Sequence, residues 1–346
     1  DGPFDVVVVD EAAQLRVAHA ALAIRFLRPD GRLIVAGDHF QLSPISVYDF
    51  GRIFDAGERH LATSFFECLL TVAARRSGSH TPPQRLNVTS VLARLCVLQE
   101  NHRMNACLGQ IAQVIYGPSF RCTPAAIDRK LDVGLDASAA PRTAFHRLLK
   151  PSPALTMYNV ESAGFSRGAV EQQEARAVAN LLQVFATAWR GSGAWTQNII
   201  VLVAHHTQRR AILAQPFVAE QPGLFVDTIE KAQGRTCEVV VLCYASAQLE
   251  RHRAGFLFTP ARLRVGLTRA RTKCIVLTSP ASLAMHRELG SRCFGDIQVL
   301  RGLHLFARVV ELSESSASAA PAVTKTEKSE EGRQPAFPSQ EMPDRR

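Results

Sequence analysis

Short, continuous apolar runs recur along the chain, and stretches with helical periodicity separate them. The clearest helical stretch, residues 170–189, places Val178, Leu182 and Phe185 on one face. Continuous rather than alternating apolar residues are typical of strands that are buried on both faces of a parallel sheet. The alternation of such strands with helices predicts an α/β fold. The strand-like runs are residues 4–9, 33–35, 155–160, 199–203, 239–242 and 274–278.

The predicted strands fall into two groups, which indicates two parallel sheets and two domains. A length of 346 residues agrees with this, at roughly 150 residues per domain. The sequence RRSGSHTPPQR, between Arg75 and Leu95, interrupts any regular element and marks the expected join. From Ser313 onward Ser, Ala, Pro, Glu and Lys dominate, a composition typical of disorder. We therefore expect a first domain over residues 1–95, a second over 96–312 and a disordered tail over 313–346.

The chain has an excess of basic residues, with 40 Lys and Arg against 31 Asp and Glu and a formal net charge of +9. Most of the basic residues are arginines, whose forked guanidinium groups suit phosphate oxygens. Nucleic acid is therefore one expected partner. An arginine-rich coding bias explains the same excess equally well.

Composition and pattern also exclude several classes of protein. No apolar run approaches the roughly 20 residues that a membrane helix needs, and no signal-peptide pattern precedes the first predicted strand. The eight cysteines never form a CxxC pair, which argues against a zinc site or a disulfide framework. We expect a cytoplasmic or nuclear protein without membrane contact. We also expect a fragment, because the chain starts at Asp1 and enters a strand at once.

Polar residues follow the first two predicted strands. Asp10 and Glu11 come after the first strand, and Gly37, Asp38 and Gln41 come after the second. Ligands of open parallel sheets bind at the carboxyl ends of the strands, where these residues would meet. Two adjacent carboxylates suit a divalent cation held by the first and a water molecule activated by the second. Alternatively, the pair is a helix cap followed by a first-turn acid.

These segments resemble the motifs of a known family of motor enzymes. DEAAQ and GDHFQLSP are similar to motifs II and III of the superfamily-one helicases, in the subgroup that contains the nonsense-mediated decay helicase. The resemblance extends over about residues 4–280 and implies two RecA-like domains, of which the first is truncated at its N-terminal side. Three further blocks follow in the expected order: LQENHRM at 98–104 (motif IV), DTIEKAQGR at 227–235 (motif V) and RVGLTRAR at 264–271 (motif VI).

The resemblance implies ATP hydrolysis with Mg²⁺ and assigns roles to individual residues. Asp10 would hold Mg²⁺ through water, and Glu11 would polarise the attacking water molecule. Arg103 and Arg269 would act as arginine fingers from the second domain. Nucleotide-binding roles are implied for Asp10, Gln14, Gly37, Asp38, Gln41, His102, Gln233 and Gly234, and contacts with single-stranded DNA or RNA for Thr207 and Thr228.

Several positions depart from the family pattern. His102 stands where a base-stacking tyrosine is usual, and Thr207 replaces a threonine that normally comes earlier in its loop. Arg269 and Arg271 flank Ala270 on a predicted helix, where a cationic face could equally be solvated surface. No lysine follows a glycine, so the phosphate-binding loop GxxxxGK[ST] of motif I is absent and is expected upstream of Asp1.

The motifs together favour an ATP-dependent nucleic-acid helicase or translocase that moves on a single strand. The chain alone is expected to be inactive without the phosphate-binding loop. The alternative is a non-catalytic nucleic-acid-binding scaffold that keeps the helicase fold. A dehydrogenase is disfavoured, because the sequence has no GxGxxG turn.

Overall fold

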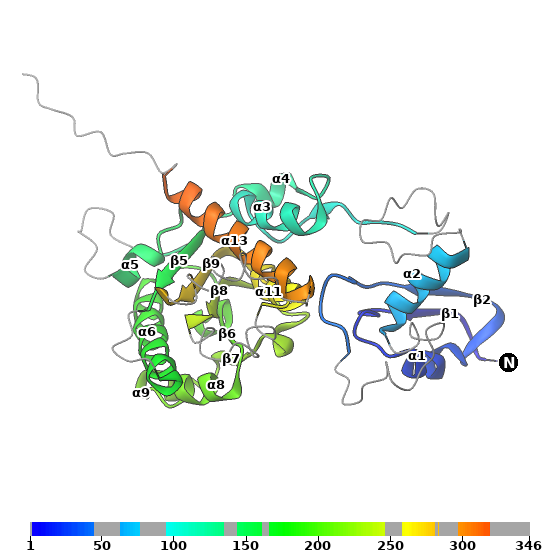
Figure 1. Cartoon of the computed structure of the whole chain (residues 1–346), viewed down its shortest axis with the longest axis horizontal. Coiled ribbons are helices and arrows are strands. Elements are labelled where there is room, and N and C mark those ends of the chain that lie inside the picture. The colour runs from blue at the N-terminus through cyan, green and yellow to red at the C-terminus, as the bar shows by residue number, and fades with distance from the viewer. Residues whose placement is uncertain are drawn as a thin grey trace, which may run out of the picture.

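The chain forms two lobes, which lie side by side in the computed structural model (Figure 1). The structure describes residues 2–44, 63–76, 95–134, 144–160, 166–245, 258–280, 283 and 297–318. The smaller lobe contains the elements up to residue 76, and the larger lobe contains those from residue 100 onward. Most of the expected join between Arg75 and Leu95 lies outside the described residues.

The first lobe is built on two parallel strands, β1 (Phe4–Val9) and β2 (Leu27–Val35), joined by helix α1 (Val17–Ile24). Val9 pairs with Val35, so both strands end at the same edge, as the positions of the polar residues predict. Helix α2 (Phe65–Arg76) packs against α1. This arrangement places the Asp10–Glu11 turn and the Gly37–Gln41 loop next to each other.

One face of β1 is open in the described part of the chain. Phe4, Val6 and Val8 are 54%, 49% and 61% exposed, so the prediction of burial on both faces is wrong for this strand as described. The reason is that α1 and α2 pack only on the face that carries Val7 and Val9.

The second lobe contains five parallel strands in the order β5-β9-β8-β6-β7. Continuous apolar runs correctly predicted four of them, because each of these strands has helices on both faces. The fifth, β7, was not predicted, since its sequence FVDT contains only two apolar residues. The strands are β5 (Leu155–Asn159), β6 (Ile199–Val203), β7 (Phe225–Thr228), β8 (Cys237–Cys243) and β9 (Ala270–Thr278).

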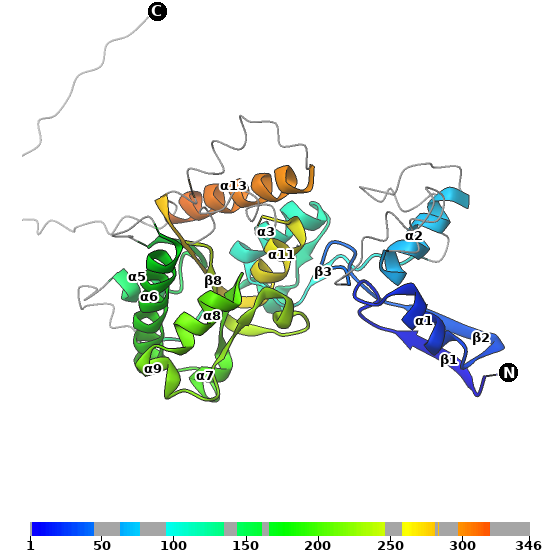
Figure 2. The ribbon, with the colours of Figure 1, turned by 60° about the horizontal axis from the view of Figure 1, so that its bottom comes forward.

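Alternate residues of these strands enter two separate cores. Val201 and Val241 belong to the core on one face of the sheet, and Leu202 and Leu242 belong to the core on the opposite face. The result is a three-layer α/β/α lobe, which Figure 2 shows with α11 and α13 on one side of the sheet and α6 and α8 on the other. The first layer contains α5 (Ala144–Leu148), α6 (Arg167–Ala188), α7 (Trp195–Asn198), α8 (His206–Leu213) and α9 (Pro216–Ala219). The second contains α3 (Ala106–Tyr116), α11 (Pro260–Leu267) and α13 (Ile297–Ser318).

Short elements complete the second lobe, and its last helix is longer than expected. Helix α13 continues to Ser318, into the segment predicted to be disordered, and the rest of that segment lies outside the described residues. None of the described helices combines the length and hydropathy needed to cross a membrane. The short elements are β3 (Glu100–Asn101), β4 (Arg121–Cys122), α4 (Pro124–Ile127) and the 3₁₀ turn η4 (Ile229–Ala232).

Candidate functional site

The turn after β1 carries Asp10 and Glu11. The backbone N–H of Glu11 donates to Asp10 Oδ1 at 2.8 Å, and Gln14 Nε2 donates to Glu11 Oε2 at 3.0 Å. Glu11 has a φ of 50°, a left-handed conformation that is uncommon for residues other than glycine. The N–H of Ala12 donates to the carbonyl of Ala36 at 2.9 Å, which holds the turn against the end of β2. Unusual backbone conformations of this kind cluster at functional sites, and both carboxylates are exposed.

The loop after β2 carries Gly37, Asp38 and Gln41. A side-chain carbon at Gly37 would come within 3.1 Å of a backbone nitrogen in the facing β1 turn, so the close approach of the two turns favours glycine. Asp38 Oδ1 accepts from the N–H of Phe40 at 2.9 Å, and Asp38 Oδ2 accepts from Gln41 Nε2 at 2.7 Å. Gln41 Oε1 is buried and has no hydrogen-bond partner. The loop is therefore ordered by Asp38, while Gln41 keeps one unused acceptor.

Arg103 and Arg269 are anchored to the same turn of the second lobe, which connects α11 to β9. Arg103 Nη1 donates to the carbonyl of Thr268 at 2.9 Å. Arg269 donates from Nε to the carbonyl of Val265 at 3.0 Å and from Nη2 to Thr268 Oγ1 at 3.0 Å. These bonds bring together two guanidinium groups that are far apart in sequence.

The charges of these arginines are coupled to the acids of the first lobe. The pKa of Arg269 is lowered to about 10, chiefly by burial and next by the positive charge of Arg103, whereas Glu11 and Asp38 act in the opposite direction. Burial also lowers the pKa of Arg103, and Glu11 again opposes this shift. Because such effects fall off over short distances, Glu11 lies close enough to both guanidinium groups to affect their pKa values. Arg269 remains charged at neutral pH.

A direct joint between the lobes lies beside this site. Tyr116, the last residue of α3, donates its hydroxyl to Asp38 Oδ2 at 2.7 Å. Arg264, on α11, donates to the carbonyl of Phe40 at 3.2 Å and lies 4.8 Å from the centre of its ring. The sequence predicted neither Tyr116 nor Arg264 as a site residue. Arg264 opens the RVGLTRAR block, which was a usable signal, but no local pattern marks Tyr116.

The remaining predicted nucleotide-binding residues differ in exposure. The side chain of His102 is 73% exposed, with Nε2 at 3.3 Å from Glu100 Oε2. Gln233 follows η4, and its Nε2 is buried without a hydrogen-bond partner. Gly234 has a φ of 80°, and a side-chain carbon added there would meet no atom within 4 Å, so backbone conformation rather than space favours glycine.

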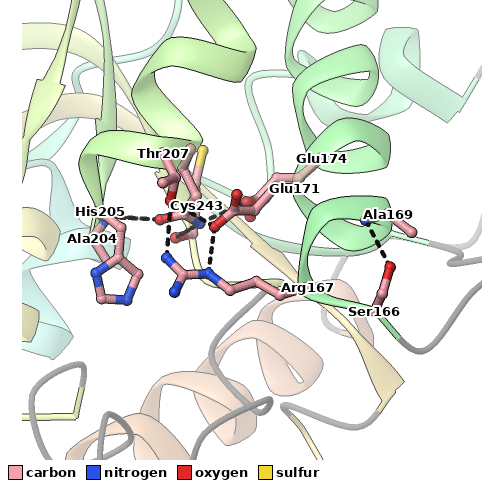
Figure 3. A network of polar contacts seen from close by, with 10 residues as sticks. Ser166, Arg167, Ala169, Glu171, Glu174, Ala204, His205, Thr207 and Cys243 are labelled. Atoms are coloured by element: carbon pink, nitrogen blue, oxygen red, sulfur yellow. Dashed lines mark hydrogen bonds and ion pairs between the residues drawn. The ribbon is translucent and has the colours of Figure 1, made fainter.

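The two threonines predicted to contact nucleic acid lie at the carboxyl edge of the second sheet. Val203, at the end of β6, pairs with Thr228, at the end of β7, and Thr207 follows in the first turn of α8. Thr207 is exposed, and its hydroxyl accepts from Arg167 Nη2 at 2.9 Å and donates to Glu171 Oε1 at 2.9 Å (Figure 3). Thr228 is only 7% exposed. The structure thus brings both residues to one edge but leaves Thr207 as the accessible one.

The segment around Ala270 differs from the prediction. Helix α11 ends at Leu267, and Ala270 begins strand β9 by pairing with Cys237 of β8. The expected helix over Arg269 and Arg271 is therefore wrong, because pairing with a central strand overrides local helical preference. Arg271 instead forms an ion pair with Glu238 across the two strands at 3.2 Å, which fits a structural role.

The residues at the interlobe site fit a polyphosphate with Mg²⁺. Within the described residues, Gln41 Oε1, Gln233 Nε2 and Arg264 Nε are buried without partners, which leaves hydrogen-bonding capacity for a ligand. The described residues contain no cluster of three or more His, Cys, Asp or Glu that could hold a metal ion alone. Mg²⁺ does not need one, since it is commonly bound by one or two carboxylates together with phosphate oxygens and water.

Comparisons with known proteins point in the same direction. A family model described as an AAA domain matches residues 84–281. The DNA replication ATP-dependent helicase/nuclease JHS1 of Arabidopsis thaliana is 25% identical over 290 residues, which are 81% of this chain and 19% of that protein. The ATP-dependent helicase NAM7 of Saccharomyces cerevisiae is 24% identical over 291 residues, which are 82% of this chain and 26% of that protein. The chain thus spans a quarter or less of the length of most such relatives.

A solved structure of the arterivirus nonstructural protein 10 helicase with DNA aligns with 81% of this chain and 41% of its own. The sequence identity is 17% and the TM-score is 0.33, which is too low to support an inference.

Proposed function

Because the chain belongs to the AAA domain family, among the superfamily-one helicases related to the nonsense-mediated decay helicase, we propose that it is the part of an ATP-dependent helicase or translocase that carries motifs II to VI. It would hydrolyse ATP between its two lobes and move on single-stranded DNA or RNA in the cytoplasm or nucleus. The observation that supports this most strongly is the contact of the loop after β2 with the second lobe, where Tyr116 donates to Asp38 and Arg264 donates to the carbonyl of Phe40.

The first lobe would supply the groups that prepare the attack on the γ-phosphate. Asp10 would hold Mg²⁺ through water, and Mg²⁺ would neutralise charge on the phosphate oxygens. Glu11 would orient and polarise the attacking water as a general base. Its left-handed backbone and its hydrogen bond from Gln14 fix the carboxylate in advance. Gln14 and Gln41 would respond to the γ-phosphate, and Gln41 has a free acceptor for a water molecule at that site.

The second lobe would supply positive charge where negative charge develops. Arg103 and Arg269 are held by the same turn, so they would approach the phosphates together. Arginine fingers in related phosphoryl-transfer enzymes contribute roughly 10³ to 10⁵ in rate. Repulsion between the two guanidinium groups also favours the binding of an anion near them. ATP would therefore draw the lobes together, and hydrolysis would release them.

Substitution of Glu11 tests the hydrolytic mechanism. We expect Glu11→Gln to reduce nucleic-acid-stimulated ATP turnover by roughly 10² to 10⁴, because the general base is lost. ATP affinity should change little, since an amide can still accept the hydrogen bond from Gln14. Turnover and binding of a fluorescent ATP analogue should be measured with the chain and with a longer form extended upstream through its gene.

Glu220→Gln, at the exposed end of α9, is the matched control and should leave turnover unchanged. Normal turnover in Glu11→Gln would contradict the mechanism. Strand binding without hydrolysis in both forms of the protein would instead favour the scaffold.

A further inference from the structure

A buried carboxylate connects three segments at the carboxyl edge of the second sheet. Glu174, on α6, is 1% exposed and lies at the carboxyl edge of the sheet, whereas Arg269 precedes the start of β9. Its Oε1 accepts from the backbone N–H of Ala245, just after β8, at 2.9 Å. Its Oε2 accepts from Gln208 Nε2, on α8, at 2.7 Å. Glu174 therefore bonds to both neighbouring elements at this edge.

Gln208 extends this connection to the turn that follows β6. Its Oε1 accepts from the backbone N–H groups of Ala204 at 3.1 Å and His205 at 3.0 Å (Figure 3). Its Nε2 also lies 3.4 Å from the carbonyl oxygen of Cys243. The side chains of Glu174 and Gln208 together satisfy three backbone N–H groups that the strands and helices leave without partners. The position of the 204–208 turn thus depends on two buried side chains.

The same helix orients the side chain that the turn exposes. Thr207 donates its hydroxyl to Glu171 and accepts from Arg167, and both partners lie on the first turns of α6. Helix α6 therefore determines both where the turn lies and where the Thr207 hydroxyl points. A change in the packing of α6 against α8 would move Thr207.

Stability alone does not account for a buried acid here, because burying a carboxylate is costly and apolar pairs are often as stable. We propose that Glu174 and Gln208 are positioning residues for nucleic-acid binding. They hold the 204–208 turn, with the exposed Thr207, at a backbone phosphate of a single strand, to which Thr207 would donate its hydroxyl in place of Glu171. This rests on the proposed function, and it assigns to Glu174 a role that acts through Thr207.

The geometry also predicts a pH dependence. The ionised carboxylate accepts both N–H groups, whereas the protonated form has only one good acceptor for two donors. Burial raises the pKa of Glu174 to about 7, and the charge of Glu171 adds to this, although both hydrogen bonds oppose it. The turn should therefore be held less firmly as the pH falls below about 7. The other ionisable groups of the packed elements are Arg167 and Arg176 on α6, His205 at the N-cap of α8, His206, Arg209 and Arg210 on α8, Cys237, Glu238 and Cys243 on β8, and His146 and Arg147 on α5; α7 and α9 contribute none.

Exchange of the two side chains gives a sharp test. In Glu174→Gln, one N–H group of the amide must face another donor, whichever way the amide is turned. In Gln208→Glu, two carboxylates face each other. In the double variant Glu174→Gln/Gln208→Glu, the carboxylate at position 208 accepts the two backbone N–H groups of the turn, and the amide at position 174 donates to it and accepts from Ala245. The exchange thus restores every hydrogen bond except the long one to Cys243.

The measurement is the affinity of the 346-residue chain for a fluorescein-labelled oligothymidine, by anisotropy at fixed salt between pH 6 and pH 8. At pH 8 we expect each single variant to bind about tenfold more weakly, because one buried hydrogen bond is mismatched. The double variant should return to within about threefold of the original affinity. In the double variant, the carboxylate at position 208 accepts three hydrogen bonds and should stay ionised. The affinity of the double variant, relative to that of the original chain, should therefore rise as the pH falls from 8 to 6.

Glu220→Gln is the matched control and should bind like the original chain throughout. Circular dichroism at each pH verifies that every variant is folded at the temperature of the assay. Folded single variants that bind with unchanged affinity and an unchanged pH profile would overturn the positioning role but leave the proposed function intact. Failure of the original chain to bind any single strand would overturn both, and the two outcomes are distinguishable.

Discussion

At the scale of single residues, Lys273 is the most enclosed basic group among the described residues of the second lobe. It is 0% exposed, lies on β9, and donates to the carbonyl oxygens of Lys150 and Pro153. Burial lowers its pKa from 10.5 to about 7. Between these two pH values the unfolded chain holds a proton that the folded chain lacks. Stability should therefore rise with pH in this window, by up to about 1.4 kcal/mol per pH unit, and be lost as the pH falls towards 7.

Lys273→Met should abolish this contribution, because the side chain no longer titrates. The prediction is checked by urea unfolding of the original chain and the variant between pH 7.5 and pH 9.5, where the two curves of unfolding free energy should converge or cross. Lys150→Met changes an exposed side chain and keeps the carbonyl acceptor, so it should preserve the original slope. Parallel curves for the original chain and Lys273→Met would mean that Lys273 is charged in the folded state.

At the scale of elements, the packing of α13 against the rest of the second lobe depends on Gly302. Phe306 packs against the Phe258 ring with centroids 5.2 Å apart, and Leu303 and Val309 are buried on the same face. A side-chain carbon at position 302 would coincide with the backbone carbonyl of Phe258. No rotamer change can relieve a clash with backbone, so α13 would have to move away.

We expect Gly302→Ala to lower the free energy of unfolding by about 3 kcal/mol, as overpacked core sites do. Gly168→Ala, near the start of α6, is the control, because nothing lies within 4 Å of the added carbon there. It should be neutral or stabilising by up to about 1 kcal/mol, since alanine favours helix. Thermal or urea unfolding of both variants measures this, and equal stability would contradict the close contact.

At the scale of the whole molecule, the relation between the lobes depends on the joint formed by Tyr116 and Arg264. Burial and the adjacent Asp38 raise the pKa of Tyr116, so its hydroxyl remains a donor well above neutral pH. Tyr116→Phe removes the hydrogen bond to Asp38 and keeps the ring contact with Phe40. We expect a broader distribution of distances between spin labels on the two lobes, with little change in the stability of the second lobe.

Tyr158→Phe is the control for this joint, because Tyr158 lies on β5 and its ring packs on Phe145 within the second lobe. It should leave the distribution unchanged. An equally narrow distribution in Tyr116→Phe would show that Arg264 and the apolar contacts of Phe40 hold the lobes without Asp38.

The parts of the structure that sequence could predict are those with a local signal. Continuous apolar runs predicted most strands, and the position of polar residues after two strands predicted the edge that carries Asp10 and Asp38. The interlobe joint could not be predicted this way, because its hydrogen bonds connect residues 78 and 224 positions apart. Glu174 was placed correctly on a helix, but its burial depends on Gln208, which is 34 residues away.

The parallel sheet of the second lobe separates two surfaces along the direction of its strands. The turn that holds Arg269 lies where β9 begins, and the turn that holds Thr207 lies where β6 ends. At about 3.3 Å per residue, a strand as long as β8 sets these surfaces roughly 20 Å apart. Because a sheet with two packed cores bends little, we expect a rotation of the lobe at the Arg269 side to move the Thr207 side with it as a rigid body. In the proposed function, the distance that a bound nucleic acid moves would then depend on the length of the β-strands, not on loop motion.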